Sequence, residues 1–254
     1  MQGALLRSVS SIVEPVPCAL CTRSLPLRNS HIISEFLYKT LYDSKHRFHQ
    51  ISATPEKLNE LLQKGLREPL LCDGCEQRLA NFERYASMVL NGGAGIGIQQ
   101  WEEDVLLSGL DYKKLKLFQL SILWRAGVSS SQAFSQVSLG PHADQLRVML
   151  DSENPGPSHA YGCLMFTLKH DGQVAQDLIV PPTWTRLAGH FAYRFVFGGM
   201  VWVFVVSKHP PREFISANFL QEDGTCIVRL QDIQELTFLV KTVAKMRRLG
   251  KLET

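Results

Sequence analysis

The chain has 254 residues, of which 45% are hydrophobic and 20% are charged. This composition is too apolar for a disordered chain and is sufficient for a sizeable core, in one large domain or two unequal ones. The formal net charge of +3 is compatible with an anionic partner but does not by itself indicate one.

The N-terminal region leads into a first cysteine motif. Residues 1–15 have weak periodicity and few charges, so we treat them as a leader of uncertain order. Cys18 and Cys21 then form a CxxC pair. The following segment, SHIISEFLYKTLY, has apolar residues at helical spacing, so we expect His31 at or just before a helix start, with Ser30 as a candidate N-cap.

A second cysteine motif follows a mixed segment. A strand-like RFHQIS precedes PEKLNELLQKGL, in which the leucine spacing and the closing Gly65 predict a short helix. Cys72 and Cys75 form the second CxxC pair, at the start of a predicted helix that ends before NGGAGIGIQQ. These glycines follow a helix instead of preceding one, and no phosphate-loop lysine accompanies them, so we expect a flexible connector.

Residues 100–254 are expected to form an α+β domain. DYKKLKLFQLSILWRAGV and PHADQLRVML predict two helices, and Arg125 within the first is expected to form a buried ion pair. After a Pro/Gly/Ser/Asn loop, five β-rich segments separated by DG, GG and EDG turns predict an antiparallel sheet with a hairpin at residues 190–207. IQELTFLVKTVAKMRRLG predicts an amphipathic C-terminal helix with a basic end.

The most apolar window, LAGHFAYRFVFGGMVWVFVVSKH, is about long enough to span a bilayer. It contains His190, Arg194 and a Gly-Gly pair, which favour a hairpin, and we expect no membrane segment. Because no signal-like N-terminus is present and the CxxC pairs suit metal thiolates better than disulfides, we expect a cytoplasmic location. Cys163 and Cys226 stand singly in strand-like segments and are expected to be buried and inert.

The two CxxC pairs together predict a structural zinc site. Its ligands would be the thiolates of Cys18, Cys21, Cys72 and Cys75, which is a usual tetrahedral set for Zn²⁺. The helix that begins at the second pair would add a favourable N-terminal dipole. Unlinked cysteines are the alternative, but the matched spacings and the reducing compartment favour zinc.

The order of these motifs resembles that of a treble clef, and residues 15–91 resemble the HNH endonucleases that share this frame. The resemblance rests on the first CxxC pair, on Ser-His-Ile at residues 30–32 and on LLCDGCE at residues 70–76. It extends to bacterial HNH-like proteins with SHII and LLCDGCE motifs, and it covers about a third of the chain. It implies an N-terminal ββα-metal-like zinc module, which would precede the helical segment and the antiparallel β-sheet domain with a C-terminal helix that the patterns above predict.

The resemblance also implies a function, the divalent-metal-dependent hydrolysis of phosphodiester bonds in nucleic acid, with DNA favoured over RNA. His31 would be the general base, and Glu76 would bind a catalytic Mg²⁺ or Mn²⁺. Glu68 or Ser30 would contribute a further oxygen. Residues 100–254 would then supply specificity or bind a protein partner.

Three positions depart from the family pattern. Ser30 stands where aspartate is usual, Glu76 stands where histidine is usual, and Arg67 lies near the middle position in place of asparagine. The alternative is therefore a non-catalytic zinc protein that binds nucleic acid or a protein partner. In that case His31 would order the zinc loop, and Glu76 would be a first-turn acid that favours the helix dipole.

Several basic residues near the module form either a track for phosphate groups or an ordinary solvated surface, because acids are interleaved with them. They are Arg23, Arg28, Lys39, Lys45, Arg47, Arg78 and Arg84. Asn81 and Glu83 are expected on the solvated face of the helix that follows the second CxxC pair.

Overall fold

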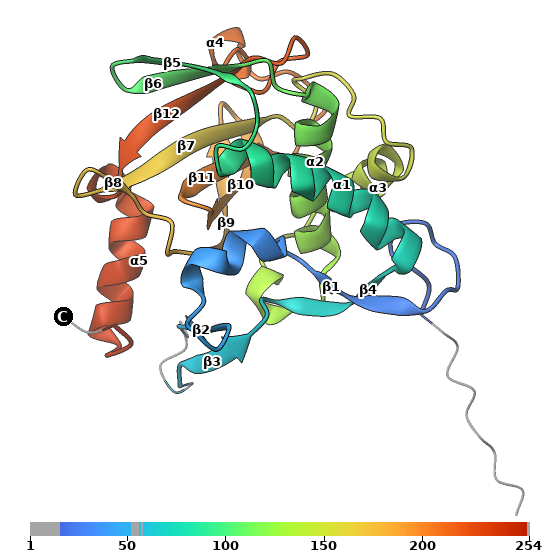
Figure 1. Ribbon diagram of the computed structural model, residues 1–254, viewed down its shortest axis with the longest axis horizontal. Helices are drawn as coiled ribbons and strands as arrows, with labels where there is room; N and C mark the ends of the chain where they lie inside the picture. The colour runs from blue at the N-terminus through green and yellow to red at the C-terminus, as the bar shows by residue number, and fades with distance from the viewer. Residues whose placement is uncertain (1–15, 52–55, 57, 253–254) are drawn as a thin grey trace, which may run out of the picture.

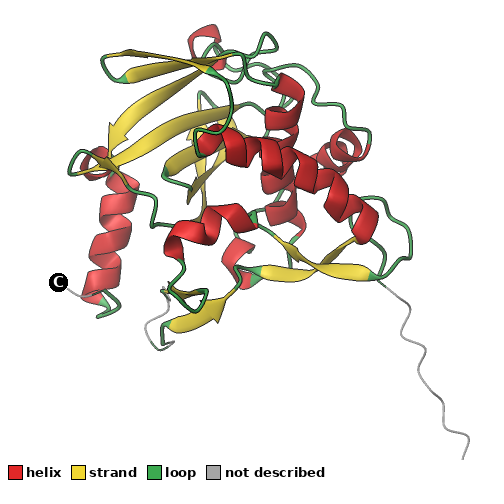
Figure 2. Cartoon of the chain, viewed as in Figure 1, coloured by secondary structure: helices red, strands yellow, loops and turns green. Residues whose placement is uncertain are grey.

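The computed structural model describes residues 16–51, 56 and 58–252, so the expected leader at residues 1–15 lies outside the described part. The predicted α+β class is confirmed: helices pack against a large, mainly antiparallel sheet (Figure 1, Figure 2).

The N-terminal part is built on two paired strands and the helix that follows them. β1 (Leu27–His31) pairs antiparallel with β4 (Arg67–Cys72), and α1 (Asp73–Leu90) begins at the next residue. Three elements lie between β1 and β4 in the sequence: the 3₁₀ helix η1 (Glu35–Leu41), β2 (Arg47–Gln50) and β3 (Glu60–Gln63). The second CxxC pair therefore lies where β4 ends and α1 begins.

Two local predictions in this part need correction. The helix expected within PEKLNELLQKGL is wrong where the chain is described, since residues 60–63 form β3, which pairs antiparallel with β2 through Phe48 and Leu62. Residues 52–55 and 57 lie outside the described part. The helix after His31 exists as η1 and begins at Glu35, so His31 ends a strand instead of starting a helix.

The central sheet has eight strands. Along its main path the order is β5 (Gly97–Trp101), β6 (Asp104–Ser108), β12 (Cys226–Asp232), β7 (Cys163–His170), β11 (Met200–Val205), β10 (His190–Phe197) and β9 (Val180–Leu187). The short β8 (Gln173–Val174) pairs with β7. All neighbours are antiparallel except β12 and β7, which are parallel.

The hairpin predicted at residues 190–207 is confirmed as β10 and β11, joined through Gly198 and Gly199 with φ of +60° and +72°. Positive φ is costly for other residues, which explains the Gly-Gly pair. The connector expected in the glycine run is partly wrong, because Gly97 begins β5, the edge strand of the sheet.

Helices cover both faces of the sheet. α2 (Tyr112–Val128) is flanked by α1 and α3 (His142–Asp151) on one side, and α5 (Thr237–Arg248) lies on the other (Figure 1). Along β10 the buried side chains alternate, so that Phe195 packs in the cluster on the α2 side and Val196 packs in the cluster with Leu239 of α5. The remaining elements are short: η2 (Gln132–Phe134), α4 (Glu213–Ser216) and η3 (Ile233–Glu235).

The core is continuous between the N-terminal part and the sheet. One cluster of buried side chains includes residues of α1, α2 and β11. They are Cys75, Leu79 and Phe82 of α1, Phe118 of α2 and Trp202 of β11. This packing fixes α1 against α2. No helix among the described residues is long and apolar enough to cross a bilayer.

Candidate metal centre and its surroundings

The four cysteines of the two CxxC pairs converge on one point. Their sulfur atoms all lie within 4.8 Å of one another. Cys18, Cys72 and Cys75 are buried and Cys21 is partly exposed. Four sulfurs at this spacing could hold one metal ion such as zinc, as the sequence predicts.

Backbone contacts fix the first CxxC turn against the second. The amide of Ala19 donates to the carbonyl of Leu70, at 3.0 Å, and the amide of Cys72 donates to Sγ of Cys18, at 3.3 Å. The turn itself closes through Thr22, whose amide donates to the carbonyl of Cys18 and whose φ is +61°. The thiol positions therefore follow from the pairing of β1 with β4.

The protonation of the thiols indicates which kind of ligand the site suits. Burial opposes ionisation of Cys21, yet hydrogen bonds from Arg23 and from the neighbouring thiols lower its pKa to about 6. Burial and the same neighbours raise the pKa of Cys75. Adjacent thiolates repel one another, so all four ionise together only when a cation offsets their charge. The donor set thus fits a divalent, thiophilic metal.

His31, the predicted general base, lies at the end of β1 and is held from two sides. Its Nε2 contacts the carbonyl oxygen of Lys64, at 2.9 Å, and also contacts the carboxylate of Glu35. A carbonyl oxygen only accepts, so Nε2 carries a proton, and Nδ1 is the basic nitrogen of the neutral ring. Among the described residues, no hydrogen-bond partner of Nδ1 is found.

The other predicted catalytic residues do not meet His31. The carboxylate of Glu68 accepts hydrogen bonds from the amide and the hydroxyl of Ser130. Glu76 has one buried carboxylate oxygen for which the described part of the chain offers no hydrogen-bond partner, and the hydroxyl of Ser30 accepts from the amide of Leu71, at 3.1 Å. Within the described part of the chain, the four cysteines are the one cluster of three or more His, Cys, Asp and Glu side chains close enough to share a metal ion.

Arg125, which the sequence analysis predicted to form a buried ion pair, lies next to His31. The Arg125 guanidinium is 2.7 Å from the Glu83 carboxylate and donates to the carbonyl of His31, also at 2.7 Å. It also contacts the hydroxyls of Ser34 and Ser121, both at 3.3 Å. The predicted buried ion pair is therefore confirmed.

Glu83 was expected on the solvated face of α1, and this is wrong. Its side chain is 23% exposed and accepts from both Arg125 and Ser34. No sequence pattern around Glu83 distinguished it from a solvated acid. Only the position of Arg125 on α2, opposite α1, assigns its partner.

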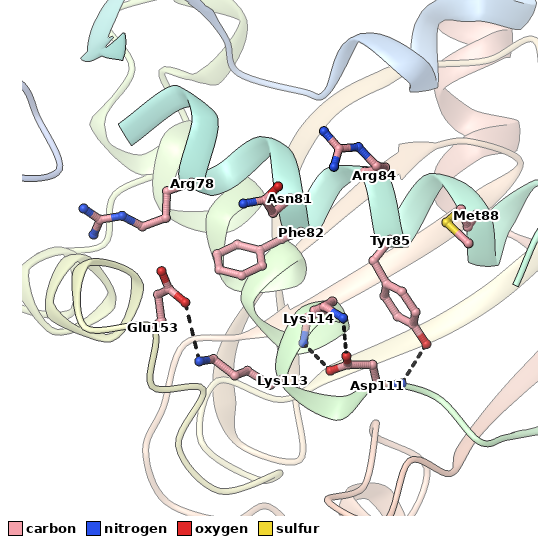
Figure 3. Close-up of a pocket in the computed structure, with 10 residues that line it drawn as sticks. All are labelled: Arg78, Asn81, Phe82, Arg84, Tyr85, Met88, Asp111, Lys113, Lys114 and Glu153. Carbon is pink, nitrogen blue, oxygen red and sulfur yellow. Dashed lines mark hydrogen bonds and ion pairs between the residues drawn. The ribbon is translucent and has the colours of Figure 1, made fainter. Parts of the chain in front are cut away.

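Three of the basic residues that the sequence proposed as a phosphate track form ion pairs. Arg28 pairs with Asp73, Arg47 with Asp43 and Arg78 with Asp151. A hollow of about 510 Å³ beside α1 contains Arg78 and Arg84 of that helix and Lys113 and Lys114 of α2 (Figure 3). Its lysines are neutralised, because Lys113 pairs with Glu153 and Lys114 with Asp111.

Comparisons with family models, with curated proteins and with solved structures give no match.

Proposed function

We propose that the protein uses a zinc-stabilised treble clef of the HNH type to bind nucleic acid without hydrolysing it. One observation carries the non-hydrolytic part: the buried Arg125 guanidinium contacts the carbonyl of His31, at the end of β1, and the carboxylate of Glu83 on α1.

A catalytic divalent cation would have to bind next to the predicted base, His31. The predicted ligand positions are Ser30 on β1 and Glu76 on α1. Arg125 instead places a permanent positive charge at the carbonyl of His31, and like charges repel most strongly where water is excluded. The ion pair between Arg125 and Glu83 also occupies a carboxylate of α1. The charge that a metal ion would supply is therefore already present as a side chain.

The nucleic-acid part rests on the cations around His31. Lys45, Lys64 and Arg67 line one hollow together, and no ion pair is found for any of them within the described part of the chain. Unpaired cations on a rigid scaffold attract phosphate groups, because binding releases the counterions condensed on the nucleic acid.

The test measures binding and cleavage on the same substrates. Single- and double-stranded DNA and RNA are titrated at several salt concentrations, and each is incubated with magnesium, manganese or a chelator. We expect salt-sensitive binding and no cleavage. Absence of binding to every substrate would contradict the proposal and favour a protein partner for residues 100–254.

Hydrolysis is the second candidate, and two observations favour it. Among the described residues, neither Nδ1 of His31 nor one buried carboxylate oxygen of Glu76 has a hydrogen-bond partner. If His31 is a general base, cleavage requires Mg²⁺ or Mn²⁺ and is lost in His31→Ala but not in His49→Ala, a control histidine exposed on β2. Cleavage that survives in His31→Ala would show that His31 is not the general base.

A further inference from the structure

A hollow of about 510 Å³ opens beside His31, between the β2–β3 pair and the start of β4. Its lining residues are Glu35, Lys45, His46, Gln63, Lys64 and Arg67. Arg67 lies directly opposite His31 in the β1–β4 register, so the hollow adjoins the residue that the sequence singled out.

The charge around this hollow is strongly one-sided. Lys45, Lys64 and Arg67 have no ion pair among the described residues. The lining contains one acid, Glu35, which contacts His31 and accepts a hydrogen bond from the hydroxyl of Tyr42, at 3.1 Å. An anion that enters therefore meets three cations and one carboxylate.

The backbone around the hollow is fixed in a conformation that few residues adopt. His46 and Lys64 have φ of +55° and +61°. Hydrogen bonds hold both: the amide of His46 donates to the carbonyl of Asp43, at 2.9 Å, and the carbonyl of Lys64 accepts from His31. Positive φ in non-glycine residues costs free energy and persists where the surroundings enforce it. The backbone that carries Lys64 is therefore preorganised.

Gly65 allows the backbone after Lys64 to lie close to His31. A Cβ atom at this position would lie 2.9 Å from the Tyr38 ring and 3.2 Å from Cδ2 of His31. Only glycine allows the backbone to approach these rings at a φ of +68°. The lysine before it is thereby held at the mouth of the hollow.

We propose that this hollow binds the terminal phosphate of a nucleic-acid strand. A monoester phosphate carries about −1.5 to −2 charges and three acceptor oxygens, whereas a backbone phosphodiester carries one charge. Three converging cations in a concave site suit the more highly charged group. The hollow beside α1 lacks this character, because its lysines are paired with acids. The proposal rests on the proposed function for the strand attached to the phosphate.

The test compares DNA and RNA 12-mers that end in 5′-phosphate, 3′-phosphate or hydroxyl, by fluorescence anisotropy on the full chain. We expect one of the phosphorylated ends to bind at least tenfold more tightly than the hydroxyl end. Arg67→Gln and Lys64→Asn should abolish this preference, and asparagine is chosen because it tolerates positive φ. Arg84→Gln, which removes a cation outside the hollow, should leave the preference unchanged.

Inorganic phosphate separates the two proposals. It should compete with the phosphorylated 12-mers and raise the thermal midpoint of the wild type but not of Arg67→Gln. Equal binding of phosphorylated and hydroxyl ends would overturn the terminal-phosphate site and leave nucleic-acid binding intact. If no 12-mer binds but phosphate still stabilises only the wild type, the phosphate site stands and the proposed function fails. If neither effect is seen, both are wrong.

Discussion

Arg125 of α2 and Glu83 of α1 form an ion pair of 2.7 Å, in which the arginine side chain is 1% exposed. This pair joins α1, the helix that follows the second CxxC pair, to α2, which packs against the sheet. Removing one member of a buried pair leaves an uncompensated charge, which costs about 3–5 kcal/mol.

We therefore expect Arg125→Met to lower the free energy of unfolding by about 3–5 kcal/mol, measured by chemical denaturation. The double variant Arg125→Met/Glu83→Gln should recover part of this loss, because no buried charge is then left alone. Equal losses in the single and double variants would show that packing, and not charge, determines the cost.

Metal content tests the cysteine cluster. The purified protein should contain one zinc ion per chain, and chelation should unfold the N-terminal part, because the four thiols come together only in the folded chain. Cys72→Ser should lose the metal. Cys163→Ala, a buried thiol outside the cluster, should keep it. Elemental analysis that finds less than half an equivalent in the wild type would contradict the zinc assignment.

Gly65 gives a prediction about local packing. Gly65→Ala should destabilise the protein by about 1–3 kcal/mol more than Gly172→Ala does. Both positions have positive φ, at +68° and +75°, but a Cβ atom meets the Tyr38 ring only at Gly65. The comparison isolates the steric contact from the backbone term, and equal thermal shifts in the two variants would show that the Tyr38 ring moves aside.

Lys116 makes the free energy of unfolding depend on pH in the alkaline range. Its side chain is buried in α2 and donates to the carbonyls of Ser158 and Tyr161. Burial lowers its pKa from 10.5 to about 8, although the nearby Cys163 and Cys226 act in the opposite direction. Between these two pH values the unfolded chain binds more protons than the folded one, so the contribution of Lys116 to stability increases as pH rises.

The wild type should therefore gain up to about 3 kcal/mol relative to Lys116→Met as pH rises from about 8 to about 10.5. Chemical denaturation of both proteins at successive pH values measures this difference. The comparison cancels the titration of tyrosines and cysteines, which both proteins share. A difference that stays constant across the interval would show that the pKa of Lys116 is not depressed.

The sequence was most informative where periodicity was long. α1 and α2 were predicted within one or two residues of their observed ends, because apolar spacing over four or more turns leaves little choice. The β10–β11 hairpin was equally clear from its Gly-Gly turn. The four thiols were predicted to meet, because the two CxxC spacings match.

Short segments were predicted less well, since pairing partners decide their structure. Leu58, Leu61 and Leu62 have helical spacing, yet Glu60–Gln63 forms a strand against β2. The glycine-rich run conceals β5, whose partner β6 also escaped prediction. The contact between Arg125 and His31 joins residues 94 positions apart, and no local pattern encodes such a distance.

The position of β12 has a consequence for the order in which the fold is completed. This strand lies between β6 and β7, although more than 50 residues separate it from the end of β7 in the sequence. The β5–β6 hairpin reaches the rest of the sheet only through it. During synthesis from the N-terminus, β6 and β7 therefore leave the ribosome well before the strand that joins them. Until Cys226–Asp232 emerges, two strand edges remain exposed, and they are the surfaces on which a chaperone or a second nascent chain would act.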